Sequence, residues 1–522
     1  MTSTTQISLL LLLIFASLPS APSSWHGVRG TRSPIEDPLH FEEATISDIQ
    51  AAFNDGKLTS FKLVQHYLEK INALNPYLNA VVEVNPNALD DAAKADLQRS
   101  VDSHLSPLHG IPVLVKDNIN TRDKLNTTSG SFALLGSIVS CDAGVIHRLR
   151  NAGAIILGKA SMSEWDNFRS IMAPQGWSPR GGQGRNPYPT TNTPCGTSSG
   201  SAIAVASNLV TVSLGTDLDG AITCPAVMNS VVGIKPTVGI TSRSGMVPIS
   251  PRLQTIGPMA RTMEDAVKLL DAITGFDPLD AKATKAAKRF IPNGGFQKSL
   301  KKDGLKGKRV GILRSFFDEY SKGSLEANTF TTHFHTMRLK GAILVDNLKM
   351  KNIEIMLNPI ANGEGIALLA EFKLSLNAYL KDLVYSPVRS LADVIAFNNH
   401  HPIEERKDEY GQKIFLASQK TNGIDVAAKK AMKRMDKLSK EGVTDLMKEK
   451  NLDAVVFPHF YGLHAFGIGG FPIVNVPAGY NGSGAPFGIS FAGLRGSDAT
   501  LIEIAYAFEQ ATQVRKPPPM LV

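Results

Sequence analysis

A lysine and a stretch rich in glycine and hydroxyl side chains are the parts of this sequence best suited to chemistry. Lys116 ends the apolar run Ile111–Val115, so we expect its amine to be buried at the end of a strand. Residues 194–226 hold two turns rich in Gly, Ser and Thr, separated by a helix of small residues and a strand. Such turns leave backbone N–H groups free to point into a cleft. A phosphate loop is not indicated, because neither turn ends in Gly-Lys-Ser or Gly-Lys-Thr.

Several blocks of the sequence resemble the amidase signature family of serine hydrolases. Their family order is kept, and the resemblance extends over residues 40–515, with a core at about 105–265. The turn Leu218-Asp219-Gly220, where the family usually has Thr-Gly-Gly, indicates the plant branch. The blocks are residues 194–226, Gly110–Asn118, Gly233–Thr237, Gly469–Pro472 and Val476–Gly479.

The resemblance implies a Ser–Ser–Lys mechanism. The base falls on Lys116, which must be neutral to accept a proton. The bridging serine, which the family holds with a cis peptide bond, falls on Thr197, and the nucleophile falls 24 positions later on Ala221. Threonine keeps the hydroxyl but has restricted rotamers, whereas a methyl group cannot form an acyl-enzyme. The resemblance therefore predicts an amide hydrolase site from which the nucleophile is missing.

The turn that should hold the oxyanion survives as backbone. The resemblance gives Leu218, Asp219 and Gly220 this role and places Ser198 beside the ligand. The site should therefore still bind a small-molecule amide or acid. No cofactor and no metal ion is expected there.

Three hypotheses follow for the function. The chain is an inactive or repurposed amidase relative, which includes a non-catalytic small-molecule-binding protein. Alternatively, it is an enzyme in which Thr197, Ser198 or Thr223 attacks, or in which Lys116 serves a condensation or an isomerisation as general acid and base. In the third hypothesis, Ala221 is a substitution in an otherwise ordinary amidase.

The elements that must position these residues alternate along the chain. Short apolar runs at 111–115, 154–157, 210–214, 454–457 and 488–491 predict buried strands, and helices are expected at 59–74, 142–152 and 498–511. This rhythm predicts an α/β fold, with a mixed, mostly parallel, twisted sheet covered by helices on both faces. Residues 276–309, with ten Lys or Arg, are interpreted as a solvated connection, the alternative being a basic docking patch.

The N-terminus predicts the compartment. The apolar run at residues 7–18 is too short to span a bilayer and is followed by small residues, which is typical of a secretory signal peptide over residues 1–24. The alternative is an uncleaved anchor. The mature chain is expected in the extracellular space, the apoplast or the vacuole, without stable membrane insertion. Triplets beginning at Asn126 and Asn481 fit the N-glycosylation pattern.

Composition and charge exclude several classes of protein. The 522 residues are 43% hydrophobic and 20% charged, which rules out wholesale disorder. The net charge of +8 is mild for this length and does not indicate a nucleic-acid partner. Cys195 and Cys224 are expected to be free thiols. His459 and His464 lack carboxylate or cysteine neighbours along the sequence, so they are interpreted as structural or solvated.

Overall fold

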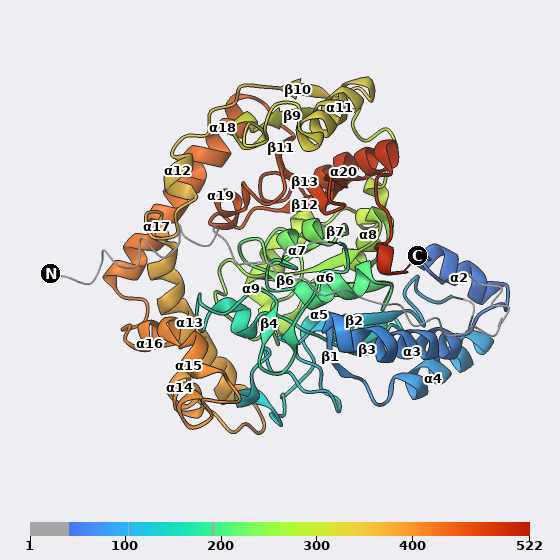
Figure 1. Ribbon diagram of the computed structural model, residues 1–522, viewed down its shortest axis with the longest axis vertical. Coiled ribbons are helices and arrows are strands. Elements are labelled where there is room, and N and C mark those ends of the chain that lie inside the picture. The colour runs from blue at the N-terminus through green and yellow to red at the C-terminus, as the bar shows by residue number, and fades with distance from the viewer. Residues whose placement is uncertain (1–40, 103, 190–192, 522) are drawn as a thin grey trace. The chain divides into compact units, whose positions relative to one another are not determined.

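The computed structural model describes residues 41–102, 104–189 and 193–521. One 11-stranded sheet runs through the fold (Figure 1). Its order places β2, which ends at Lys116, between β3 and β6. Across the sheet the strands are β1 (Val81–Val84), β3 (Ile155–Ala160), β2 (Pro112–Lys116), β6 (Val212–Asp217), β8 (Thr255–Ala260), β7 (Val232–Lys235), β12 (Ile473–Tyr480), β13 (Pro486–Ala492), β11 (Ala454–Pro458), β9 (Arg309–Ile312) and β10 (Ile343–Val345).

The predicted mixed α/β sheet is confirmed, but parallel pairing is confined to two regions. Strands β3, β2 and β6 pair in parallel, and so do β11, β9 and β10. The central strands β6, β8, β7, β12 and β13 pair antiparallel, so the expectation of a mostly parallel sheet is wrong there. One physical reason is the tight turn between β12 and β13, in which the Asn481 side chain accepts hydrogen bonds from the backbone of Ser483 and Ala485.

Helices flank the sheet and are anchored on it by apolar contacts. Helices α6 and α7 pack on the central strands and on each other, and α8 and α20 do the same. The α-helices up to residue 287 are α2 (Ile46–Asn54), α3 (Ser60–Leu78), α4 (Ala88–Val101), α5 (Gly144–Asn151), α6 (Ser199–Ala206), α7 (Thr223–Met228), α8 (Met263–Ile273) and α9 (Ala281–Ala287). Those that follow are α10 (Arg314–Phe317), α11 (Leu325–Leu339), α12 (Ile353–Met356), α13 (Glu364–Asp382), α14 (Leu391–His400), α15 (Lys407–Tyr410), α16 (Lys413–Gln419), α17 (Val426–Ser439), α18 (Asp445–Glu449), α19 (Leu463–Gly467) and α20 (Asp498–Thr512).

The helix expected at 59–74 begins where its cap predicts. The Thr59 side chain accepts a hydrogen bond from the N–H of Lys62. The helix then runs through Pro76 and ends only where Asn79 adopts a left-handed conformation (φ 51°). The expected helices at 142–152 and 498–511 are α5 and α20, with ends shifted by a few residues.

The basic segment 276–309 is folded rather than a fully solvated connection. Phe296 and Leu305 are completely buried, and the short helical turn around Phe296 packs on α8 and α20. Most of the lysines of the segment remain exposed, because their amines need water.

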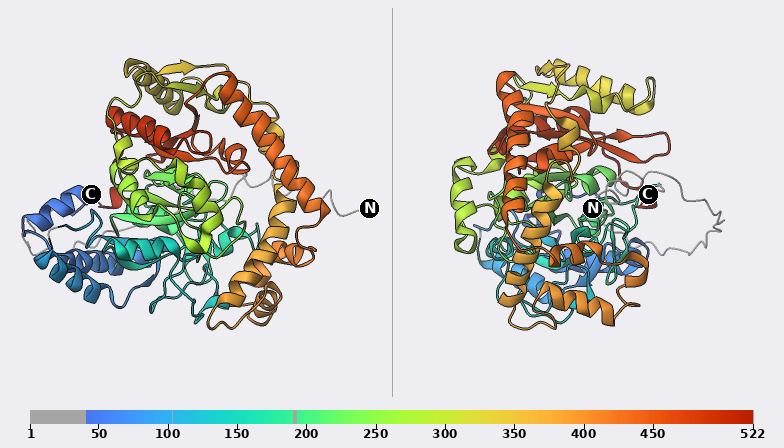
Figure 2. Two further views of the ribbon diagram at one scale, coloured as in Figure 1. Left: turned by 180° about the vertical axis from the view of Figure 1, so that it is seen from behind. Right: turned by 90° about the vertical axis from the view of Figure 1, so that its left-hand side faces the viewer.

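A second group of helices gathers beside the sheet rather than on it (Figure 2). Phe372 and Leu376 of α13 and Phe415 of α16 form an apolar cluster that also contains Trp165. This cluster fixes the loop after β3, which contains Trp165 and the neighbouring Asp166.

Two expectations concern the membrane and the N-terminus. Within the described ranges, no helix is both long enough and apolar enough to cross a bilayer. The signal peptide expected over residues 1–24 lies outside the described residues.

Candidate active site

The structure brings Lys116 and Thr197 together, although 81 positions separate them. Lys116 is completely buried at the end of β2. Its Nζ donates to Oγ1 of Thr197 at 2.7 Å and to Oγ1 of Thr216, on the neighbouring strand β6, at 2.8 Å. The amine therefore sits where the resemblance to amidases places the base.

A third partner of Lys116 is Asp166, which the sequence did not indicate. Its Oδ1 lies 2.6 Å from Nζ of Lys116 and accepts a hydrogen bond from Oγ1 of Thr197 at 2.7 Å. Its Oδ2 accepts from Nδ2 of Asn118 at 2.9 Å. Asp166 belongs to three consecutive residues with positive φ, Trp165–Asn167 (49°, 53° and 61°). This backbone is costly for residues other than glycine and is held here by the surrounding packing.

The contacts of Lys116 are those of an ammonium ion. Asp166, Thr197 and Thr216 supply one oxygen to each of its three N–H bonds. Burial lowers the pKa of Lys116, and the Asp166 carboxylate acts in the opposite direction. Burial therefore favours the neutral form of this amine, while the carboxylate at 2.6 Å favours its ammonium form.

Ala221 lies beside the Lys116–Thr197 pair in a turn that follows β6. Its carbonyl oxygen accepts a hydrogen bond from the N–H of Ser198 at 3.1 Å, which places it next to the turn that carries Thr197. The Ala221 methyl group is partly exposed, unlike the fully buried residues that follow it. The position that the resemblance assigns to the nucleophile is thus adjacent to the lysine site and offers only a methyl group.

Two residues expected to contact the ligand are already engaged. The N–H of Gly220 donates to Oδ1 of Asp217 at 2.8 Å, and the Ser198 hydroxyl is bonded to the backbone of Thr216. Within the described part of the chain, the N–H groups of Leu218, Asp219 and Ala221 donate to no protein acceptor. All three of these residues are partly exposed. The backbone donors available for a ligand oxygen therefore belong to Leu218, Asp219 and Ala221, and not to Gly220.

Two further expectations about this region are corrected. Cys195 and Cys224 are bonded as a disulfide with Cα atoms 5.6 Å apart, because the turn before Thr197 packs against the start of α7. Cys141 is the free cysteine. The peptide bond before Thr197 is trans, because positive φ angles at Cys195 (61°) and Gly196 (58°) make the turn instead.

His464 has carboxylate neighbours in space that it lacks along the sequence. Its Nδ1 lies 2.5 Å from Oδ2 of Asp219, and the proximity of this carboxylate raises the pKa of His464 to about 9. Glu364 lies close to both. Only Asp219 of this group was a candidate from the sequence, since the three residues are far apart in the chain.

Comparisons with known proteins identify the family of the chain. The family model described as Amidase matches residues 62–469. A probable amidase of Arabidopsis thaliana is 54% identical over 486 residues, covering 93% of each chain. The structure of native peptide amidase from Stenotrophomonas maltophilia superposes with a TM-score of 0.85 at 41% identity, covering 92% of this chain and 99% of that one. An amidase family protein from Bacillus anthracis gives a TM-score of 0.85 at 36% identity, covering 91% and 92%. The chain therefore belongs to the amidase signature family.

Proposed function

We propose that this chain binds a small amide or carboxylic acid at the Lys116–Thr197–Ala221 site and does not hydrolyse it through an acyl-serine. The observation that carries this proposal is the Ala221 methyl group at the position adjacent to the lysine. Without an oxygen at this position, the covalent step of the family's mechanism has no nucleophile. The bridging residue, Thr197, retains its hydroxyl.

The hydrogen bonds of the Lys116 amine support the same proposal. A general base must present a lone pair to the proton that it removes. The ammonium of Lys116 instead donates to three oxygens, one of which is the carboxylate of Asp166 at 2.6 Å. We therefore propose that the site differs from an amide hydrolase at two groups, the nucleophile and the base.

Ligand binding needs neither of these groups. The N–H groups of Leu218, Asp219 and Ala221 are donors without a protein acceptor among the described residues, which suits the oxygen of an amide or a carboxylate. One structural relative is named as a peptide amidase. A peptide ending in a carboxamide, and the corresponding free acid, are therefore the ligands to test first.

We expect such a ligand to stabilise the native chain without being consumed. At a ligand concentration of about 100 times the dissociation constant, the stabilisation should be about 2.7 kcal/mol. Thermal unfolding with increasing ligand measures the stabilisation, and mass analysis of the ligand afterwards measures how much of it has been hydrolysed. Ala221→Leu should abolish the stabilisation by filling the space beside the donors, while Ala286→Leu, at an exposed position of α9, should not. Turnover by the native chain, or equal stabilisation of Ala221→Leu, would contradict the proposal.

One contact favours a second candidate function, hydrolysis with Thr197 as the nucleophile. The Thr197 hydroxyl donates to Oδ1 of Asp166 at 2.7 Å, which is the arrangement of a nucleophile and its base. In that reaction Thr197 would form an ester with the acyl group and release the amine, and water would then cleave the ester. Native turnover that disappears in both Thr197→Val and Asp166→Asn would support this candidate over the first.

We also propose that the chain passes through the secretory pathway. Disulfides persist in oxidising compartments, and the bond between Cys195 and Cys224 lies directly beside the candidate site. Asn481, in an exposed turn, is well placed for glycosylation, whereas the Asn126 amide is bonded to Glu83. Alkylation of unreduced chain isolated from plant tissue should label Cys141 alone. Labelling of all three cysteines before reduction would contradict the proposal.

A further inference from the structure

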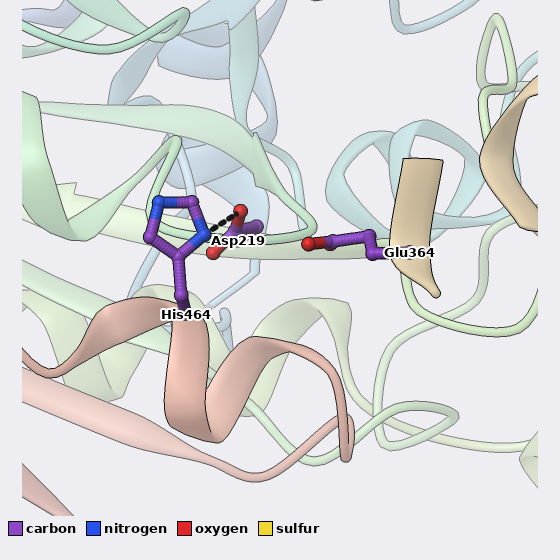
Figure 3. A group of neighbouring side chains, drawn as sticks. All are labelled: Asp219, Glu364 and His464. Carbon is purple, nitrogen blue, oxygen red and sulfur yellow. Dashed lines mark ion pairs between the residues drawn. The ribbon is translucent and has the colours of Figure 1, made fainter. Parts of the chain in front are cut away.

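Three side chains from distant parts of the chain converge next to the candidate active site (Figure 3). Asp219 lies in the turn after β6, Glu364 begins α13 and His464 belongs to α19. One potential ligand atom from each residue lies within 4.8 Å of the other two. Figure 3 shows Asp219 between the other two, with the Glu364 carboxyl group directed toward it.

Three carboxyl oxygens of this cluster have no hydrogen-bond partner among the described residues. Glu364 is only 2% exposed, and both of its carboxyl oxygens are buried without a partner among the described residues. Oδ1 of Asp219 is likewise buried without a hydrogen bond within the described part of the chain, whereas Nδ1 of His464 is buried and paired with Oδ2 of Asp219 at 2.5 Å. Leaving one buried polar group unsatisfied costs about 1–3 kcal/mol, and more when the group is charged. Three such oxygen atoms beside one ion pair point to a missing component.

The component that fits is a small cation. Carboxylate oxygens supply lone pairs, and the His464 nitrogen supplies one when a metal ion displaces its proton, so the partner must be electron-poor. The nearby cation Arg252 does not fill this role, since its Nε is bonded to Glu371 at 3.2 Å. An organic ligand is a poorer fit than a metal ion, because each of the three unpartnered oxygens and the His464 nitrogen is almost completely covered.

We propose that Asp219, Glu364 and His464 bind one divalent transition-metal ion, with Zn²⁺ the first candidate. Zn²⁺ accepts imidazole nitrogen together with carboxylate oxygen, whereas Mg²⁺ and Ca²⁺ prefer oxygen alone. Three protein ligands leave at least one coordination position for water or for a ligand oxygen. Asp219 is two residues before Ala221, so the ion would lie at the edge of the candidate active site.

This proposal is independent of the proposed function, because metal binding requires neither an organic ligand nor turnover. It differs from the expectation, drawn from the sequence, that the site holds no metal. That expectation rested on sequence neighbours of the histidines, while the carboxylates come from a strand end and a helix start elsewhere in the chain.

The test is titration of the chelator-treated full chain with Zn²⁺ by calorimetry, with metal content measured after dialysis. We expect one Zn²⁺ per chain, and at least about tenfold weaker binding in Glu364→Gln and in His464→Gln, since even outer-sphere partners of a metal ligand contribute that much. His459→Gln, which alters a neighbouring histidine outside the cluster, should bind like the native chain. Thermal unfolding of each variant in chelator checks that the fold is kept.

Co²⁺ provides a readout that needs no variant. Bound at a site with three protein ligands, Co²⁺ should give the intense visible absorption of four- or five-coordinate geometry, and Zn²⁺ should displace it. Absence of stoichiometric Zn²⁺ binding, an unchanged affinity in both Glu364→Gln and His464→Gln, or a Co²⁺ spectrum identical to that of the aqueous ion would each overturn the proposal.

Discussion

Ala221→Ser combined with Asp166→Ala should give this chain measurable amide hydrolysis. We expect a gain of about 10³-fold or more over the native chain, part of the roughly 10⁶-fold that a serine hydrolase loses with its nucleophile. The first change supplies the attacking oxygen beside Thr197. The second removes the carboxylate that lies 2.6 Å from Lys116, so that burial lowers the pKa of the amine with only the Asp217 charge acting against it. Release of ammonia from a peptide carboxamide measures the rate.

The single variants separate the two defects. Ala221→Ser alone should be slower than the double variant by about 10² to 10⁴, the usual contribution of a general base. Asp166→Ala alone should remain inactive, because it has no nucleophile. Adding Lys116→Met to the double variant should abolish its activity. Full activity of Ala221→Ser with Asp166 in place would show that the Lys116–Asp166 ion pair does not block the base.

Arg169→Met should lower the free energy of unfolding by about 3–5 kcal/mol, the usual cost of removing one partner from a buried ion pair. Arg169 is 1% exposed, and its Nη1 donates to Oε1 of Glu164 at 2.9 Å and to Oε2 of Glu405 at 3.2 Å. The same nitrogen donates to the carbonyl oxygen of Glu405 at 2.9 Å. Without the guanidinium, two buried carboxyl groups would face each other. These contacts connect the loop that carries Asp166 to the segment before α15.

Denaturant unfolding, followed by fluorescence and by circular dichroism, measures this loss. Arg406→Met is the matched control, since Arg406 also lies near the Trp177 ring. Its side chain is 55% exposed, and its ion pair with Glu409 is longer, at 3.5 Å. An exposed pair of this kind contributes about 1 kcal/mol or less. Equal losses in the two variants would mean that burial of the Arg169 network adds no stability.

The positions of several strands and of Lys116 could be predicted from the sequence. Apolar runs of five or so residues mark β2, β3 and β11, because strands buried on both faces need apolar residues at nearly every position. Lys116 could be placed at a strand end on this pattern. Strand direction could not be predicted in the same way, because it depends on the connections, and the tight turn at Asn481 gives an antiparallel pair.

The remaining site residues carry no local signal. Asp166 reaches Lys116 from an irregular loop whose conformation is fixed by the packing of Trp165 against α16, so no periodicity points to it. Glu364 and His464 meet Asp219 only because α13 and α19 pack near the end of β6. The bond between Cys195 and Cys224 likewise depends on two turns approaching within 5.6 Å, which spacing along the chain does not reveal.

Intact-mass analysis after incubation with an activated acyl ester tests most directly whether this chain lacks an acyl-accepting group. Peptide mapping of residues 194–226 then locates any adduct. The native chain should show none in this segment, while the variant that carries Ala221→Ser and Asp166→Ala should be acylated at position 221. An acyl group on Thr197, Ser198 or Thr223 of the native chain would contradict the account and identify a replacement nucleophile.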